Sequence, residues 1–150
     1  MNTLYISNGQ FSLTDLIEIE KHNPTLALSG EAIQKIEHCR NYLDHKLQNS
    51  DDLFYGINTG FGYLQNVAIS TGQIAELQYN LLKSHACGMG DEAPDEIVRW
   101  MIFLKVQSLA QGYSGVQLAT VQRLIDFYNN GIIPVIYTQG SLGASVDLSP

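Results

Sequence analysis

Apolar residues recur at the spacing of amphipathic helices in five stretches of the chain. Residues 31–48 are the clearest example, because Ile33, Ile36, Leu43 and Leu47 fall on one face of a helix. Polar residues occupy most of the opposite face. The helices predicted by this pattern cover residues 15–22, 31–48, 72–86, 95–111 and 116–128.

Residues that can cap a helix precede three of these stretches. Ser12 or Thr14 can cap the first helix, Ser70 or Thr71 the third, and Ser114 the last. Hydroxyl side chains suit such positions because they accept a hydrogen bond from an amide that the first helical turn leaves unpaired.

Two short apolar runs, residues 25–29 and 132–137, lack helical spacing and are predicted to be extended. Glycine-rich stretches at 56–62 and 138–150 predict loops. The sequence therefore predicts a mainly α protein with short strands and glycine-rich loops.

The predicted helix at 95–111 is apolar nearly all round. Such a helix is expected to be buried on most sides, and it needs more than one partner surface to cover it. Its longest apolar run, residues 97–104, contains Arg99 and is far shorter than the roughly 20 residues that cross a bilayer. We therefore expect no membrane association through this helix, and the first residues show no signal-peptide pattern.

The chain has 150 residues and a formal net charge of −7, which suits one folded domain and argues against nucleic-acid binding. Its two cysteines, Cys39 and Cys87, have no metal-ligand spacing, which favours reduced thiols and a cytoplasmic location. His38 and His45 are two helical turns apart, about 10 Å, which is too far for one zinc ion to bridge. No metal site is predicted.

Two positions carry candidate chemistry, and each also has a plain structural interpretation. The glycine-rich stretch 56–62 lacks the Lys-Ser/Thr of a phosphate-binding loop; it is either a simple loop or a loop that carries Tyr55 into a site. With few apolar anchors, it is expected to be mobile in the isolated chain. His85 shares a helix face with Leu77 and Leu81, so it is either a satisfied core or C-terminal capping residue or a ligand-facing one.

Taken together and in order, four segments resemble the aromatic amino acid ammonia-lyase family. Residues 55–62 (YGINTGFG) resemble the family's inner active-site loop, and residues 77–85 (LQYNLLKSH) resemble its substrate-selectivity helix. Residues 112–115 (GYSG) also match, and residues 140–150 (GSLGASVDLSP) are similar to the signature that builds the family's prosthetic group. The resemblance implies the N-terminal portion of the family's helical-bundle fold, with residues 1–150 forming part of a larger lyase domain that is cut after this signature.

The resemblance is strongest to the members that act on histidine, and it implies non-oxidative elimination of ammonia from L-histidine to give trans-urocanate. In the family an Ala-Ser-Gly triplet cyclises into a methylidene-imidazolone, an electrophile that needs no external cofactor. By resemblance, Tyr55 is the base that removes the β-proton, His85 faces the ring of the substrate, and Ala144 and Ser145 begin the triplet. The family also implies a homotetramer.

The third triplet position departs from the family, because Val146 stands where the family has glycine. Cyclisation brings the amide nitrogen of this residue against the carbonyl two residues earlier, and a β-branched side chain crowds so tight a turn. We therefore expect the prosthetic group not to form in this chain.

Two other interpretations stay open. The chain could serve a tyrosine or phenylalanine ammonia-lyase or a 2,3-aminomutase of the same family, because a histidine at position 85 also suits a phenolic ring. Alternatively, it could be a non-catalytic, degenerate fragment that acts only by associating through exposed apolar helices, an interpretation favoured by Val146 and by the abrupt end of the sequence.

Overall fold

The structure is a computed structural model that describes residues 2–7 and 9–141. The chain divides into two compact units. The first unit comprises Met1–Gln48 and Pro94–Pro134, and the second comprises Asn49–Ala93 and Val135–Pro150.

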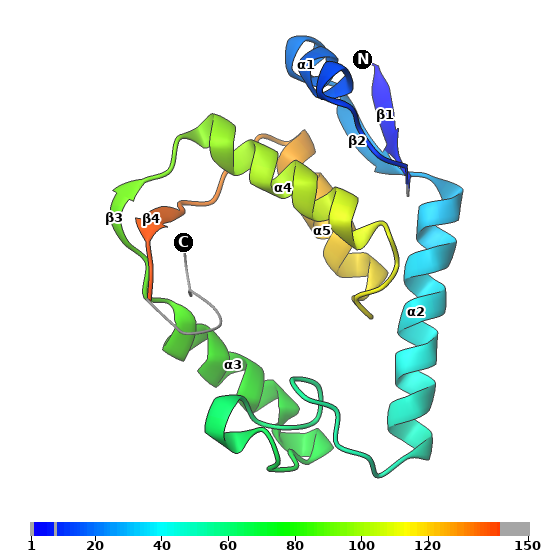
Figure 1. Cartoon of the computed structure of the whole chain (residues 1–150), viewed down its shortest axis with the longest axis vertical. Helices are drawn as coiled ribbons and strands as arrows, with labels where there is room; N and C mark the ends of the chain where they lie inside the picture. The colour runs from blue at the N-terminus through cyan, green and yellow to red at the C-terminus, as the bar shows by residue number, and fades with distance from the viewer. Residues whose placement is uncertain (1, 8, 142–150) are drawn as a thin grey trace. The chain divides into compact units, whose positions relative to one another are not determined.

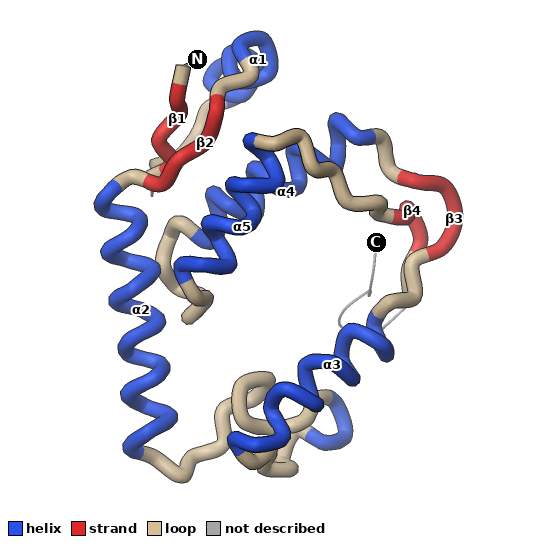
Figure 2. The backbone as a smooth tube through the Cα atoms, turned by 180° about the vertical axis from the view of Figure 1, so that it is seen from behind, coloured by secondary structure: helices blue, strands red, loops and turns tan. Residues whose placement is uncertain are grey.

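The described residues form a mainly α structure, as predicted, with five α-helices and four short strands (Figures 1 and 2). The helices are α1 (Leu13–His22), α2 (Gly30–Asn49), α3 (Ile74–His85), α4 (Asp95–Leu109) and α5 (Leu118–Asn129). The strands are β1 (Thr3–Ile6), β2 (Thr25–Leu28), β3 (Met89–Glu92) and β4 (Tyr137–Gln139).

The first unit begins with a β-α-β element in which β1 pairs with β2 in parallel, Thr3 opposite Thr25 and Ile6 opposite Leu28. Ser12 caps the intervening α1, as predicted, by accepting a hydrogen bond from the amide of Asp15 at 3.2 Å. The Asp15 carboxylate in turn accepts from the Ser12 hydroxyl and amide, and these two bonds lower the pKa of Asp15. The prediction of a strand at 25–29 is confirmed, whereas β1 was not predicted.

The core of the first unit forms around Phe103 of α4, whose side chain is fully buried. The rings of Phe11, Trp100 and Tyr128 surround it, with centroids 5.2–6.3 Å from its own. Residues from β2, α2 and α5 complete this cluster. Edge-to-face and tilted aromatic contacts of this kind add to the free energy gained by burying the rings.

Only one face of α4 is buried among the described residues, so the expectation that this helix is covered on most sides is wrong. Val98, Ile102 and Val106 face the core, whereas Ile97 and Leu104 are 49% and 53% exposed. The reason is that α5 and the segments around it cover a single stripe of the helix, and the sequence pattern alone does not reveal how many partners a helix has.

Two predicted caps are also wrong. The last helix begins at Leu118 after Gln117, rather than after Ser114, because Gly115 has a φ of +65° and keeps this stretch out of the helix. A short 3-10 helix (Thr71–Gln73) precedes α3, and the Ser70 hydroxyl bonds the Gln73 side chain instead of a helix amide. The run 132–137 was predicted to be extended, but residues 132–136 form a loop. The strand in this part of the chain, β4, begins only at Tyr137.

Asn129, the last residue of α5, joins the helix to β2. Its Oδ1 accepts from the Leu26 amide at 2.7 Å, and its Nδ2 donates to the Leu26 carbonyl at 2.9 Å. Because the amides of Thr25 and Ser29 bond the β1 side, the Leu26 groups lie on the other edge of β2. The Asn129 side chain thus pairs both backbone groups of Leu26 on the free edge of β2, although the two residues are 103 positions apart in the sequence.

We expect Asn129→Ala to lower the free energy of unfolding of the first unit by about 1–2 kcal/mol, because two backbone groups lose their partners. Urea unfolding followed by the fluorescence of Trp100, the single tryptophan, measures this change. The matched control is Asn130→Ala, since Asn130 is also exposed but bonds only the Asp126 carbonyl of its own helix. Equal destabilisation by both variants would contradict the bridging role of Asn129.

Candidate functional site

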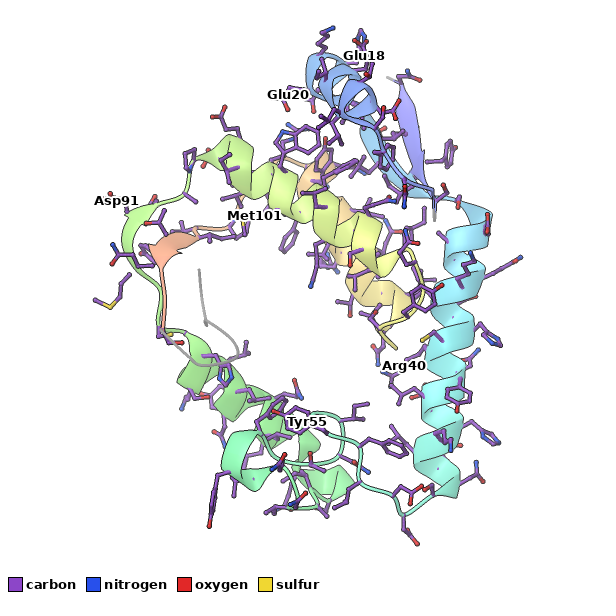
Figure 3. All side chains as sticks on the ribbon, viewed as in Figure 1. Glu18, Glu20, Arg40, Tyr55, Asp91 and Met101 are labelled. Atoms are coloured by element: carbon purple, nitrogen blue, oxygen red, sulfur yellow. The ribbon has the colours of Figure 1, made fainter. Side chains whose placement is uncertain are left out.

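Tyr55 lies in the loop between α2 and α3, within the second unit (Figure 3). Its ring is 62% exposed and packs edge-on against Phe61, with the centroids 5.6 Å apart. The aromatic pair fixes one side of the ring while the other parts remain accessible. A residue that must meet a substrate needs this combination of support and access.

Two polar side chains hold the loop in shape. Asn58 accepts from the Phe54 amide at 2.7 Å and donates to the Asp52 carbonyl at 2.9 Å. The fully buried Thr59 hydroxyl accepts from the Gly56 amide and donates to the Gly60 carbonyl. Short polar side chains that bond nearby backbone groups are typical of tight turns.

The loop then folds back on the chain that follows it. Thr59 forms an antiparallel bridge with Ala68, the Gly60 amide donates to the Val67 carbonyl at 3.1 Å, and the Ile69 amide donates to the Asn58 carbonyl at 2.9 Å. The sequence predicts a mobile loop because few apolar side chains are available to pack it. These hydrogen bonds argue against that mobility, because they hold the loop without apolar contacts. The Gly60 and Ile69 amides are therefore expected to be protected from hydrogen exchange.

Gly60 is the point of closest approach in this loop. A Cβ at this position would lie 2.6 Å from the Cβ of Leu64 and 2.9 Å from its carbonyl oxygen. Gly56 is required for a different reason, since its φ is +74°. The glycines of the YGINTGFG segment therefore shape the loop that carries Tyr55, with no phosphate needed to explain them.

His85 is the last residue of α3, and the prediction for this helix is confirmed within two residues. Leu77, Leu81 and His85 are all half-buried and four residues apart, so they share one face as predicted. The Nδ1 atom of His85 lies 2.8 Å from the hydroxyl of Ser84. His85 thus stands at the end of a half-buried stripe, with one ring nitrogen engaged by its neighbour.

The pairing of β3 with β4 connects the end of α3 to the chain that leads into the 140–150 segment. Met89, four residues after His85, pairs with Gln139, which is five residues before Ala144. The Ala93 amide also donates to the Ile136 carbonyl at 2.7 Å. Two segments that are 50 residues apart in sequence, by the difference between 139 and 89, therefore lie side by side (Figure 2).

Gly88 permits this pairing, because a Cβ there would lie 2.8 Å from the Tyr137 ring. β3 was not predicted, because residues 89–92 carry glycine and two acids. Of β4, only Tyr137 fell within the run 132–137 that was expected to be extended, since 138–150 was expected to be loop. Pairing between distant segments stabilises both strands, and no local propensity reveals it.

The GYSG match has a packing explanation in the first unit. Gly112 has a φ of +74° and leaves room for the backbone of Lys35, which a Cβ would approach to 2.8 Å. The Gly115 carbonyl accepts from Arg40 of α2 at 3.2 Å, and Arg40 also pairs with Asp44 (Figure 3). This motif positions a turn against α2.

Tyr55, His85 and β4, the strand that leads to the signature segment, all belong to the second unit and lie on three different elements. Ala144, Ser145 and Val146 lie outside the described residues, so their arrangement is not part of this geometry. Sequence reasoning missed Asn58 and Thr59, although an Asn-Thr pair between two glycines is itself a signal for a side-chain-stabilised turn.

Two further findings concern the described part of the chain. Among these residues no group of three or more His, Cys, Asp or Glu side chains is placed to hold a metal ion. None of the helices described there is both long and apolar enough to cross a membrane.

The shape of the Tyr55 loop yields the first test of the site. We expect Gly60→Ala to speed amide exchange at positions 60 and 69 roughly tenfold to hundredfold, because a Cβ there overlaps Leu64 at a cost of about 1–3 kcal/mol. Hydrogen exchange read by NMR or mass spectrometry measures this. Gly72→Ala is the control, since nothing lies within 4 Å of a Cβ at that position. Unchanged exchange in Gly60→Ala would show that the close approach does not hold the loop.

Comparison with known proteins identifies the family. Residues 11–150 match the family model for aromatic amino acid lyase. The chain is 46% identical over 145 residues to a histidine ammonia-lyase from Geobacillus sp. (strain WCH70), covering 97% of this chain and 28% of the relative. It is 38% identical over 149 residues to a histidine ammonia-lyase from Streptococcus gordonii, covering 99% of this chain and 29% of the relative.

Solved structures show the same similarity. The histidine ammonia-lyase of Trypanosoma cruzi superposes with a TM-score of 0.80 at 32% identity, over 94% of this chain and 27% of that one. The ergothioneine-degrading ergothionase of Treponema denticola superposes with a TM-score of 0.85 at 26% identity, over 93% and 28%. This chain spans less than a third of the length of these relatives. The chain belongs to the aromatic amino acid lyase family.

Proposed function

We propose that this chain supplies part of an ammonia-lyase site for L-histidine, in which Tyr55 moves a proton and His85 faces the ring of the substrate. The pairing of β3 with β4 carries the proposal, because it joins the chain just after His85 to the chain just before the 140–150 signature. The identity to relatives named histidine ammonia-lyase supports histidine over other substrates.

The proposed roles follow from the geometry of each residue. The Tyr55 hydroxyl is carried by a hydrogen-bonded loop and an aromatic partner, so it is held in place yet accessible. As a general base it would take the β-proton of the amino acid, a role that positioned side chains fill at typical gains of 10²–10⁴ in rate. His85 would bind the substrate ring from the end of α3.

The family's methylidene-imidazolone supplies the electrophile that activates the amino group, and it forms from the protein itself. Position 146 does not fit that group, because Val146 places a β-branched side chain where the cyclising backbone needs glycine. We therefore propose that Val146 prevents the group from forming and that a glycine at this position is needed for turnover.

Assembly and location are part of the same proposal. The exposed Ile97 and Leu104, together with Met101 (Figure 3), form an apolar stripe along α4 that further parts of the lyase or other subunits would cover. A homotetramer, as in the family, would provide such surfaces. In the described part of the chain Cys39 and Cys87 are not joined in a disulfide, which is in keeping with a cytoplasmic location.

Val146 and the exposed stripe on α4 also favour a second candidate, a non-catalytic chain that acts only through association. A tyrosine or phenylalanine lyase, or an aminomutase, is a third. Tyrosine aminomutase of Streptomyces globisporus superposes with a TM-score of 0.82 at 24% identity, which shows a shared fold.

We expect Tyr55→Phe to reduce ammonia release from L-histidine by about 10²–10⁴-fold in the whole protein carrying Val146→Gly. Loss of the hydroxyl removes the base and leaves the aromatic contact with Phe61 in place. Ammonia release is measured with L-histidine, L-tyrosine and L-phenylalanine in parallel.

The matched control is Tyr42→Phe, because Tyr42 is also 62% exposed but lies on α2 in the first unit. An equal loss in both variants would contradict the assignment of Tyr55. No ammonia from any amino acid, with or without glycine at 146, would favour the non-catalytic candidate.

A further inference from the structure

The first unit contains a pocket where α1, α4 and α5 meet. Its volume is about 190 Å³. The polar and aromatic part of its lining consists of Glu20, Asn23, Glu96, Arg99, Trp100 and Tyr128. A cavity of roughly 150 Å³ between apolar side chains is large enough to hold benzene. The pocket therefore suits a small molecule of about that size rather than a nucleotide.

The guanidinium group of Arg99 is held in place within this pocket. Its central carbon lies 4.3 Å from the centroid of the Tyr128 ring, and one terminal nitrogen donates a hydrogen bond to Oδ1 of Asn23. Tyr128 is 5% exposed and packs against Phe103, so the ring beneath the guanidinium belongs to the core. Stacking on a fixed ring orients the plane of the group and leaves its edges accessible.

Most of the N–H groups of Arg99 are available to a ligand. A guanidinium carries five N–H donors, and among the described residues Asn23 is the hydrogen-bond partner of this one. Glu96 lies three residues earlier on α4 and Glu20 lines the same pocket, yet the ion pairs of the described residues join neither carboxylate to Arg99. A carboxylate matches two parallel donors of a fixed guanidinium. Arg99 is thus suited to bind the carboxylate of a ligand.

The other side chains of the pocket restrict this ligand further. Glu20 (Figure 3) and Glu96 are both exposed, and neither forms an ion pair in the described part of the chain. Two negative charges repel a simple anion, whereas a ligand that also carries an ammonium group gains from them. Ile19 and Trp100 add apolar surface to the lining. A carboxylate, an ammonium group and an apolar part within one small molecule describe an α-amino acid.

We propose that this pocket binds a free α-amino acid with an apolar side chain, whose carboxylate is held by Arg99 and whose ammonium group faces Glu20 and Glu96. The apolar side chain of the ligand lies against Trp100. This inference goes beyond the proposed function and does not depend on the roles proposed for residues of the second unit. Because the ligand contacts both α1 and α4, its binding stabilises the first unit against unfolding.

Fluorescence of Trp100, the single tryptophan, tests the proposal because this ring lines the pocket. The probe is L-leucine, and equilibrium dialysis provides an independent measurement. We expect saturable binding with a dissociation constant on the order of 1 mM, in keeping with so small a ligand. Isocaproate lacks the amino group and isoamylamine lacks the carboxylate, so each should bind at least about tenfold more weakly. No saturable binding of L-leucine, or equal affinity for all three compounds, overturns the proposal.

Replacement of the guanidinium tests the carboxylate site. We expect Arg99→Ala to weaken L-leucine binding by about tenfold to hundredfold, because hydrogen bonds to a charged group are lost. Arg99→Lys keeps the charge but loses the paired donors, and it should weaken binding by about tenfold. Arg123→Ala is the matched control, since Arg123 is an exposed arginine of the same unit that pairs with Asp126 of its own helix. Unchanged affinity in Arg99→Ala, or an equal loss in Arg123→Ala, contradicts the assignment.

A variant that unfolds would lose all binding, so the two glutamates provide a second test. Glu20→Gln combined with Glu96→Gln keeps the size of both side chains and removes their charges. We expect L-leucine to bind about tenfold more weakly and isocaproate to bind at least as tightly as before, because the ammonium group loses its partners while the repulsion of the carboxylate disappears. Loss of both ligands, or no change for L-leucine, contradicts the proposed position of the ammonium group.

Discussion

The close approach of the Gly60 backbone to Leu64 is the contact on which the Tyr55 loop depends. There is no room for a Cβ at this point, and the chain can therefore turn back so that Thr59 meets Ala68 and the Gly60 amide reaches Val67. The turn places Phe61 against the Tyr55 ring. The backbone geometry of the loop thus holds an exposed tyrosine. The fully buried Thr59 stabilises the loop through hydrogen bonds to Gly56 and Gly60.

The same steric rule explains why position 146 matters. The family places glycine where the backbone must fold on itself to cyclise, and this chain places valine there. The described elements next to this segment, α3 and the β3–β4 pair, are formed in this chain. We propose that the side chain at position 146 is what separates this scaffold from the chemistry of the family.

Helical periodicity predicted all five α-helices because each has an apolar face that recurs within a few residues. The strands β1 and β3 escaped prediction because their stability comes from partners 22 and 50 residues away, as with Thr3 opposite Thr25 and Met89 opposite Gln139. The face shared by Leu77 and His85 followed from spacing alone. The roles of Asn58 and Thr59 did not, because each depends on which backbone group a short side chain reaches.

Intact-mass measurement of the purified chain tests the consequence of Val146 most directly. Formation of the methylidene-imidazolone removes two molecules of water from the protein, so a reacted chain is lighter than its translated sequence. We predict that the chain with Val146 has the full translated mass, with Ser145 an ordinary serine. A mass lower by two waters would show that the β-branched residue permits cyclisation, and would contradict the steric argument for this position.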